Sequence, residues 1–528
     1  MTEDFQEATT IILRKNQLQR QALRESNLAF QYGRRRMLLD LLLAVLGGLL
    51  MSLAYPPVGW SWLAWVGLIP LYLLVRRAPP WRAALFGLVW GYAWSTASFF
   101  WLREIETFIP WAMGLVLGLF PAAWAVVVPG LRRHLLIPAG IQLKGFRVEY
   151  HFNAWPWSIE LLFVAALAAW WVVLEWIRSW IATGLPWNLL ATTQWQNIPL
   201  IQICEYTGVY GVSFILALVN FALAAAFTRT AIFTSSHPGR QFGALATVLL
   251  LTGAVVVFGY FMVTQNATFE GDTVTFSAAV IQGDISQRRQ ANADQAREAV
   301  DKYIHLSLEA AQHSPDLIIW PETATPYPLR GDSPPCKSFA AKFHQLMAET
   351  SIPYLIGSID FESLPEGTKR QPGITNSALL FDRHGRLVDK FDKIHTVPFG
   401  EYIPLRRYLP RKVISMIDMG RDLTPGVRFE PLPVYPGVRA GVSICFEDVF
   451  PYIARKEAQL GANLLAVITN DAWYPVSSEP EQHLANSIFR TVETRLPMVR
   501  CGNNSASCLI DATGIIRDTI FHTKDESG

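Results

Sequence analysis

Three segments in the second half of the chain carry side chains of the kinds that acyl transfer requires. Glu322 follows the apolar run Leu317–Trp320, Lys393 lies in KIHTVPFGEYIP, and Cys445 lies in GVSICFED directly after an expected strand. A thiol attacks carbonyl carbon as a thiolate, and its free pKa is about 8.5. Cys445 therefore needs a base, for which Glu322 is the candidate. The negative oxygen of a tetrahedral intermediate can be stabilised by Lys393 and by the backbone N–H of Phe446.

Each of these residues taken alone also has an ordinary structural interpretation. A cysteine at the end of a strand is commonly a small core residue. Glu322 could cap a helix or lie on the surface, and Lys393 lies in the charged stretch DKFDK, where lysines are usually solvated. The order Glu-Lys-Cys, with each residue inside a long specific string, favours the catalytic interpretation.

The elements expected around these residues are those of an α/β domain over residues 273–528. Amphipathic spacing predicts helices at Ala291–Gln312 and Phe339–Thr350. Short β-type runs alternate with them, which is typical of α/β folds, and the length is enough for one full core. Buried strands are expected in TFSAAVIQGD, DLIIWPE, IPYLIGSID, NSALLFD, RAGVSICFED, LLAVITND and SCLIDATG.

The first half of the chain is dominated by long apolar runs, and it raises the hydrophobic content of the whole chain to 51%. A membrane-spanning helix needs roughly 20 mainly apolar residues. Seven candidate spans are expected between residues 37 and 264: Met37–Tyr55, Trp60–Val75, Ala83–Trp101, Phe108–Pro129, Ile159–Ile181, Val212–Phe227 and Ala244–Val263.

Charge and cysteine content exclude several other functions. The net charge is only +2, so nothing global indicates a nucleic-acid partner. The five cysteines are an odd number without a CxxC pair, which argues against a metal site or a disulfide framework. We therefore expect no cofactor and no metal.

The distribution of arginine and lysine predicts the orientation in the membrane, because these residues are retained in cytoplasmic loops. The tail, residues 1–36, ends in three arginines and is expected in the cytoplasm. Alternate joints between spans are basic, and the remaining joints are poor in positive charge. Seven spans then place the domain at 273–528 outside the cytoplasm. The basic joints contain Arg76, Arg77 and Arg82; Arg132, Arg133, Lys144 and Arg147; and Arg229 and Arg240.

The joint Gly184–Gly211 is long and carries two tryptophans, two prolines and the lone acidic residue Glu205. Two interpretations remain open. It could form an ordinary aromatic belt at the membrane interface. It could also be a re-entrant or interfacial segment that shapes a lipid entry route.

The strings WPET, KIHTVPFGE, ICFED and ITNDAWY resemble the signature of the nitrilase superfamily. The form KIHTVPFGEYIP, together with the membrane bundle, TGLPW and EYTGVYGVSF, resembles the apolipoprotein N-acyltransferase family. This resemblance implies an αββα nitrilase sandwich attached to a helical membrane bundle. It makes Glu322 the general base, Lys393 the oxyanion-stabilising residue and Cys445 the nucleophile. Glu401 and Glu447 match further functional positions.

The chain departs from the family pattern in several places. Phe446 stands where the family commonly has Tyr beside the nucleophile, and Pro475 follows DAWY where a Gly is usual. A last core segment and a final transmembrane helix are expected to be missing after Gly528.

The resemblance implies transfer of a fatty acyl chain from a membrane phospholipid to the N-terminal amine of a diacylglyceryl-cysteine lipoprotein. A cysteine thioester would be the intermediate, and the reaction would be the last step of lipoprotein maturation. It also implies a bacterial inner-membrane location with a periplasmic catalytic domain. Two alternatives remain: a membrane-tethered amidohydrolase, in which water takes the acyl group, and an inactive lipoprotein-binding paralogue.

The predicted orientation can be tested with topology reporters. A reporter fused after Thr264 should be active only outside the cytoplasm, because an odd number of spans precedes it. A reporter fused after Arg229 should be active only inside. The reverse pattern at both positions would show that the orientation is wrong.

Overall fold

The computed structural model describes residues 34–136, 157–230, 242–267, 275–286, 293–325, 327–365, 368–411, 414, 422–474 and 477–520. Most of the tail, and Lys144, Arg147, Arg240 and Pro475, lie outside these residues. Two compact units are present. One contains Met1–Arg178 and Ser213–Ala254, and the other contains Ser179–Val212 and Val255–Gly528.

The first unit is helical, and every expected membrane segment contains a helix. Four of these helices are long and apolar enough to cross a membrane, within Ile109–Arg132, Trp157–Arg178, Val209–Thr228 and Gly243–Gln265. The count of seven spans and the orientation therefore stay predictions. The helices in the expected membrane segments are α2 (Arg34–Ser52), α3 (Ile69–Val75), α4 (Pro80–Ser98), α5 (Ile109–Leu136), α6 (Trp157–Arg178), α9 (Val209–Thr230) and α11 (Gly243–Ala267). The start of α9 and the part of α11 from Val255 onward belong to the second unit.

Helices α4 and α5 approach each other closely through small residues. A Cβ added at Gly91 would lie 2.8 Å from the Cα of Gly118, and one at Gly87 would lie 2.5 Å from the carbonyl oxygen of Pro121. Glycines at such positions let two helices pack backbone against backbone.

The second unit is built on two sheets. One has the order β1-β2-β3-β4-β5 and the other β11-β10-β9-β8-β7-β6. Strands β7, β8 and β9 run parallel, so their carboxyl ends lie at one edge. The strands are β1 (Ala278–Val280), β2 (Leu317–Trp320), β3 (Tyr354–Phe361), β4 (Ile374–Phe381), β5 (Leu387–Asp392), β6 (Leu432–Tyr435), β7 (Val438–Ile444), β8 (Leu464–Thr469), β9 (Met498–Gly502), β10 (Ser507–Ile510) and β11 (Ile516–Ile520).

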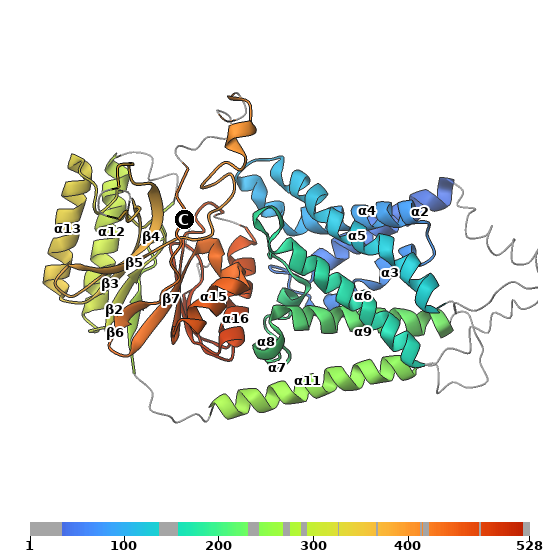
Figure 1. The fold of residues 1–528 in the computed structure, drawn as a ribbon. Helices are drawn as coiled ribbons and strands as arrows, with labels where there is room; N and C mark the ends of the chain where they lie inside the picture. The colour runs from blue at the N-terminus through green and yellow to red at the C-terminus, as the bar shows by residue number, and fades with distance from the viewer. Residues whose placement is uncertain are drawn as a thin grey trace, which may run out of the picture. The chain divides into compact units, whose positions relative to one another are not determined.

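Side chains alternate across the buried strands and so build two cores. Leu317 and Ile319 of β2 face the second sheet, whereas Ile318 and Trp320 pack beneath α12 (Ala293–Ala311) and α13 (Pro334–Thr350). Helices α15 (Pro451–Gln459) and α16 (Glu479–Thr494) lie on the other side, α15 directly against β7 (Figure 1). The expected αββα sandwich is confirmed.

All seven strands expected from the sequence are present, as are both helices. Strands β5, β6, β9 and β11 were not predicted. Sequence segment 179–212 forms the short helices η5 (Leu190–Gln194), α7 (Ile198–Ile201) and α8 (Cys204–Thr207), and it belongs to the same compact unit as the two sheets.

Candidate active site

Cys445 lies at the carboxyl end of β7, where the chain turns into the 3-10 helix η8 (Cys445–Val449). Its backbone φ is 55°, in the left-handed region. This conformation costs a non-glycine residue about 1–3 kcal/mol and persists only where surrounding contacts impose it. The thiol is partly buried. Such a strained strand-to-helix turn is a common way of presenting a nucleophile.

The Lys393 ammonium is buried between two carboxylates. Its Nζ lies 3.2 Å from Oε1 of Glu322 and 3.0 Å from Oε1 of Glu401, and the side chain is only 1% exposed. Three of the residues singled out from the sequence are therefore brought together, from the end of β2 and from the segment that follows β5.

Two asparagines complete the hydrogen bonding of Glu322. Asn376 on β4 donates from Nδ2 to Oε1 of Glu322 (2.7 Å) and to Oε1 of Glu401 (2.9 Å). The backbone N–H of Asn470, directly after β8, donates to Oε2 of Glu322 (3.1 Å). Both oxygens of the carboxylate are therefore held, and its orientation is fixed.

The charges in this cluster determine the state of the thiol. Burial raises the pKa of Cys445, the Glu322 carboxylate raises it further, and Lys393 acts in the opposite direction, leaving the pKa well above its usual range. Burial would lower the pKa of Lys393, but Glu322 and Glu401 hold it well above the usual value. At neutral pH the site therefore contains a protonated Cys445 thiol.

Glu447 connects the nucleophile turn to the segment that carries Lys393. Its Oε1 accepts the backbone N–H groups of Ile394 (2.7 Å) and His395 (2.9 Å), and its Oε2 accepts that of Ile444 (2.8 Å). Burial raises the pKa of Glu447 to about 7, although these backbone donors and Lys393 lower it. The contacts of Glu447 fit a residue that positions the reacting groups.

Phe446, expected to supply its backbone N–H, also has an aromatic environment. Its ring lies edge-on to Phe450 at 4.9 Å between centroids and near His395 at 5.6 Å. His395 in turn stacks on Phe450 at 3.8 Å. Burial, assisted by Lys393, lowers the pKa of His395 to about 4, so this ring is neutral. The packing of Phe446 requires no phenolic hydroxyl.

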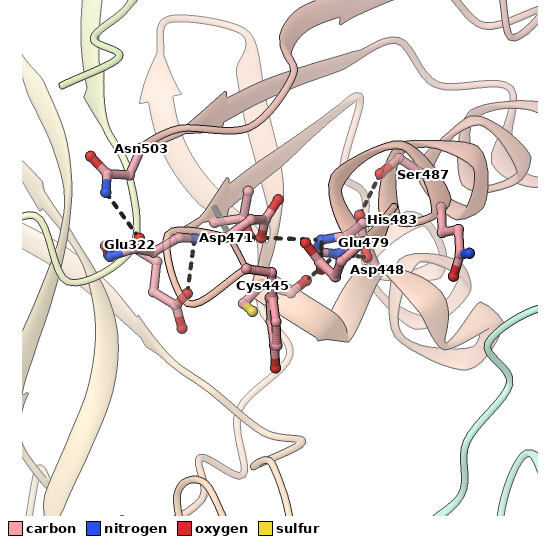
Figure 2. Close-up of polar contacts among 12 residues, drawn as sticks. Glu322, Cys445, Asp448, Asp471, Glu479, His483, Ser487 and Asn503 are labelled. Atoms are coloured by element: carbon pink, nitrogen blue, oxygen red, sulfur yellow. Dashed lines mark hydrogen bonds and ion pairs between the residues drawn. The ribbon is translucent and has the colours of Figure 1, made fainter. Parts of the chain in front are cut away.

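A second polar cluster lies beside Cys445, and no role for it was predicted from the sequence (Figure 2). It contains Asp448, Asp471, Glu479, His483 and Arg500, all buried. Asp471 lies in ITNDAWY and Asp448 lies in ICFED. These two members of the cluster therefore lie in strings that resemble the nitrilase signature. His483 and Arg500 carried no signal of their own.

Three side chains of this cluster are grouped closely enough to share a metal ion. The ligand atoms of Asp471, Glu479 and His483 lie within 4.8 Å of one another. Arg500 already lies beside them, with Nη2 3.6 Å from Oδ2 of Asp471 and Nη1 2.7 Å from Oδ2 of Asp448. A guanidinium that balances these carboxylates makes the cluster poorly suited to a cation.

Two protein-family models match the chain. The family described as apolipoprotein N-acyltransferase N-terminal domain matches residues 47–222, and the carbon-nitrogen hydrolase family matches residues 277–520. An apolipoprotein N-acyltransferase of Geobacter metallireducens is 35% identical over 90% of this chain and 86% of its own length. One of Gloeobacter violaceus is 30% identical over 92% and 86%.

Solved structures that resemble the chain include Nit3 of Saccharomyces cerevisiae, a member of branch 10 of the nitrilase superfamily. It is 17% identical with a TM-score of 0.34, over 47% of this chain and 86% of that one. A carbon-nitrogen hydrolase of Helicobacter pylori is 18% identical with a TM-score of 0.33, over 47% and 85%.

The fold and the matched domains define an enzyme of the carbon-nitrogen hydrolase class that carries a membrane-helical domain. Within that class, the chain belongs to the apolipoprotein N-acyltransferase family. It is therefore an acyltransferase.

The buried cluster of Glu322, Lys393 and Glu401 predicts how substitutions will change the rate at which Cys445 is acylated. Glu322→Gln should slow thioester formation about 100- to 10,000-fold, because the thiol loses its base. Lys393→Ala should slow it about 100- to 1,000-fold, because the oxyanion loses a charged donor. The measurement is the rate of acyl-enzyme formation, followed by mass spectrometry.

Lys390→Ala is the matched control for these variants. Lys390 lies on β5, is 10% exposed and pairs with Asp360 at 3.2 Å, so its removal also deletes a largely buried ammonium. We expect its acylation rate to stay within about threefold of the parental rate, since the reacting groups are untouched. A parental rate in Glu322→Gln or in Lys393→Ala would contradict the role given to that residue.

Proposed function

We propose that this chain transfers a fatty acyl group from a membrane phospholipid to the α-amine of the diacylglyceryl-cysteine at the N terminus of a lipoprotein. The observation that carries the proposal is the nucleophile turn of Cys445 close to the buried Glu322–Lys393–Glu401 cluster. Family membership supports the lipoprotein acceptor, because the curated relatives are named apolipoprotein N-acyltransferases.

The first half-reaction acylates the enzyme. Glu322 takes the proton of the Cys445 thiol as the sulfur attacks the ester carbonyl carbon of the phospholipid. Lys393 and the N–H of Phe446 stabilise the resulting oxyanion. When the intermediate collapses, the C–O bond breaks, and protonated Glu322 returns its proton to the leaving lyso-phospholipid oxygen. The product is a thioester on Cys445.

The second half-reaction transfers the acyl group to the lipoprotein. The neutral α-amine attacks the thioester carbonyl, and Glu322 accepts the proton that the new amide nitrogen loses. The C–S bond breaks, and the leaving sulfur takes the proton from Glu322. The protonated resting thiol is regenerated, and the lipoprotein amine carries an amide-linked fatty acyl chain.

The membrane helices are consistent with two lipid substrates. Moving an acyl chain from bilayer to water costs about 0.8 kcal/mol per CH₂, so a site near the bilayer surface avoids a large penalty. The arginine and lysine distribution supports an inner-membrane protein with its catalytic domain on the periplasmic side. The amidohydrolase alternative is not favoured, because the curated relatives are named apolipoprotein N-acyltransferases. The inactive-paralogue alternative is not favoured, because the chain retains Glu322, Lys393 and Cys445.

The proposal predicts a hydroxylamine-labile fatty acyl adduct on Cys445 of the protein purified from membranes, detectable by peptide mass spectrometry. Cys445→Ala should lack the adduct. Cys336→Ala, which removes a buried cysteine of α13, should retain it.

Adding a diacylglyceryl lipopeptide with a free α-amine should discharge the adduct to an N-acylated product. An adduct that persists in Cys445→Ala would contradict the assignment of the nucleophile. Discharge to free fatty acid at one rate with and without lipopeptide would favour the amidohydrolase.

A further inference from the structure

His483 on α16 is fully buried and touches the backbone of the nucleophile. Its Nε2 lies 2.7 Å from Oδ1 of Asp448 and 3.3 Å from the carbonyl oxygen of Cys445. A carboxylate and a carbonyl can only accept hydrogen bonds. Nε2 must therefore carry the hydrogen, which is directed at both oxygens.

On the opposite side of the imidazole ring, Nδ1 of His483 faces two further carboxylates. Nδ1 of His483 lies 3.4 Å from Oδ1 of Asp471 and 3.5 Å from Oε1 of Glu479. Burial would lower the pKa of His483, but Asp448 and Asp471 hold it well above its usual value, while Arg500 opposes this. The ring is therefore an imidazolium with donors on both sides, and with Arg500 it balances the charges of Asp448 and Asp471.

Segment 179–212, which connects α6 to α9 in the sequence, covers this histidine. The Trp187 ring lies 5.2 Å from the His483 ring, at an interplanar angle of 37°. Nε1 of Trp187 and Nδ2 of Asn188 both donate to Oε1 of Gln482, the neighbour of His483 on α16, at 3.0 and 3.1 Å. The same segment is attached at its far end, where Arg495 pairs with Glu205 at 2.8 Å.

The nucleophile turn is therefore held from two directions. Glu447 accepts the N–H of Ile444, just before Cys445, and His483 reaches the carbonyl of Cys445 itself. A residue at φ 55° returns to a commoner conformation when such contacts are lost. That relaxation would turn the thiol away from its base.

We propose that His483 is a positioning residue, whose Nε2–H fixes the left-handed turn of Cys445 so that the thiol faces Glu322, and that Trp187 holds the His483 ring in place. The inference rests on the proposed role of Cys445 as nucleophile. It gives segment 179–212 a part in catalysis, because the chain between two membrane helices supports the residue that orients the thiol.

The test is the rate at which iodoacetamide alkylates Cys445 in the full chain in detergent at neutral pH, after hydroxylamine has removed any acyl adduct, read from the Cys445 peptide by mass spectrometry. This readout needs no lipid substrate. His483→Gln places an amide N–H near the position of Nε2, whereas His483→Asn places it near Nδ1. His313→Asn, at an exposed histidine beyond α12, is the matched control.

We expect His483→Asn to lower the alkylation rate at least tenfold, since small displacements of a reacting group can cost about 100-fold. His483→Gln should stay within about threefold of the parent, and His313→Asn should be unchanged. Thermal unfolding of each variant separates lost stability from lost orientation. A parental rate in His483→Asn, or equal losses in the Asn and Gln variants at equal stability, would overturn the proposal.

Trp187→Leu tests the same inference where the histidine variants do not fold. It should slow alkylation about threefold while leaving every hydrogen bond of Nε2 in place, and an unchanged rate would overturn the role of Trp187. If the alkylation rates follow the expected order but Cys445 never carries a fatty acyl group, the proposed function fails and the positioning role of His483 stands.

Discussion

The Lys393 ammonium, buried between Glu322 and Glu401, is the constraint on which the rest of the site depends. A charge with almost no exposure is tolerated only when it is paired and its partners are hydrogen-bonded. That requirement brings together the end of β2, Asn376 on β4 and the segment after β5. It also holds the Glu322 carboxylate beside Lys393, and burial together with that carboxylate keeps the pKa of the Cys445 thiol well above its usual range.

The conformation of Cys445 depends on a second set of contacts, made largely to the backbone. Glu447 attaches the end of β7 to the segment after Lys393, and His483 approaches the Cys445 carbonyl from α16. These contacts impose an unfavourable φ on Cys445. Segment 179–212 extends the support beyond the sandwich, since Trp187 and Asn188 bind Gln482. The Cys445 thiol is thus oriented by residues of several elements that lie far apart in the sequence.

Sequence patterns could predict the features of the protein that are recorded in a short continuous stretch of the chain, either a characteristic string of residues or a long apolar run. They singled out Glu322, Lys393 and Cys445, whose catalytic roles stay predictions, and they predicted the strands with long apolar runs. They missed two strands whose buried charges are paired. Strand β5 contains Lys390, which pairs with Asp360, and β9 contains Arg500, which pairs with Asp448. Asn376 was placed on a strand without a role, and His483 was not noticed. The partners of such residues are defined only by the fold.

The central claim is that the carboxylates of Glu322 and Glu401, and not the sulfur of Cys445, carry the negative charge that Lys393 balances in the resting site. The most direct test is the ultraviolet absorbance of thiolate, measured as the difference between the parent and Cys445→Ser across the pH range. The account predicts no thiolate signal from Cys445 at neutral pH and its appearance only above the usual range of cysteine. A Cys445 thiolate already present at neutral pH would contradict it.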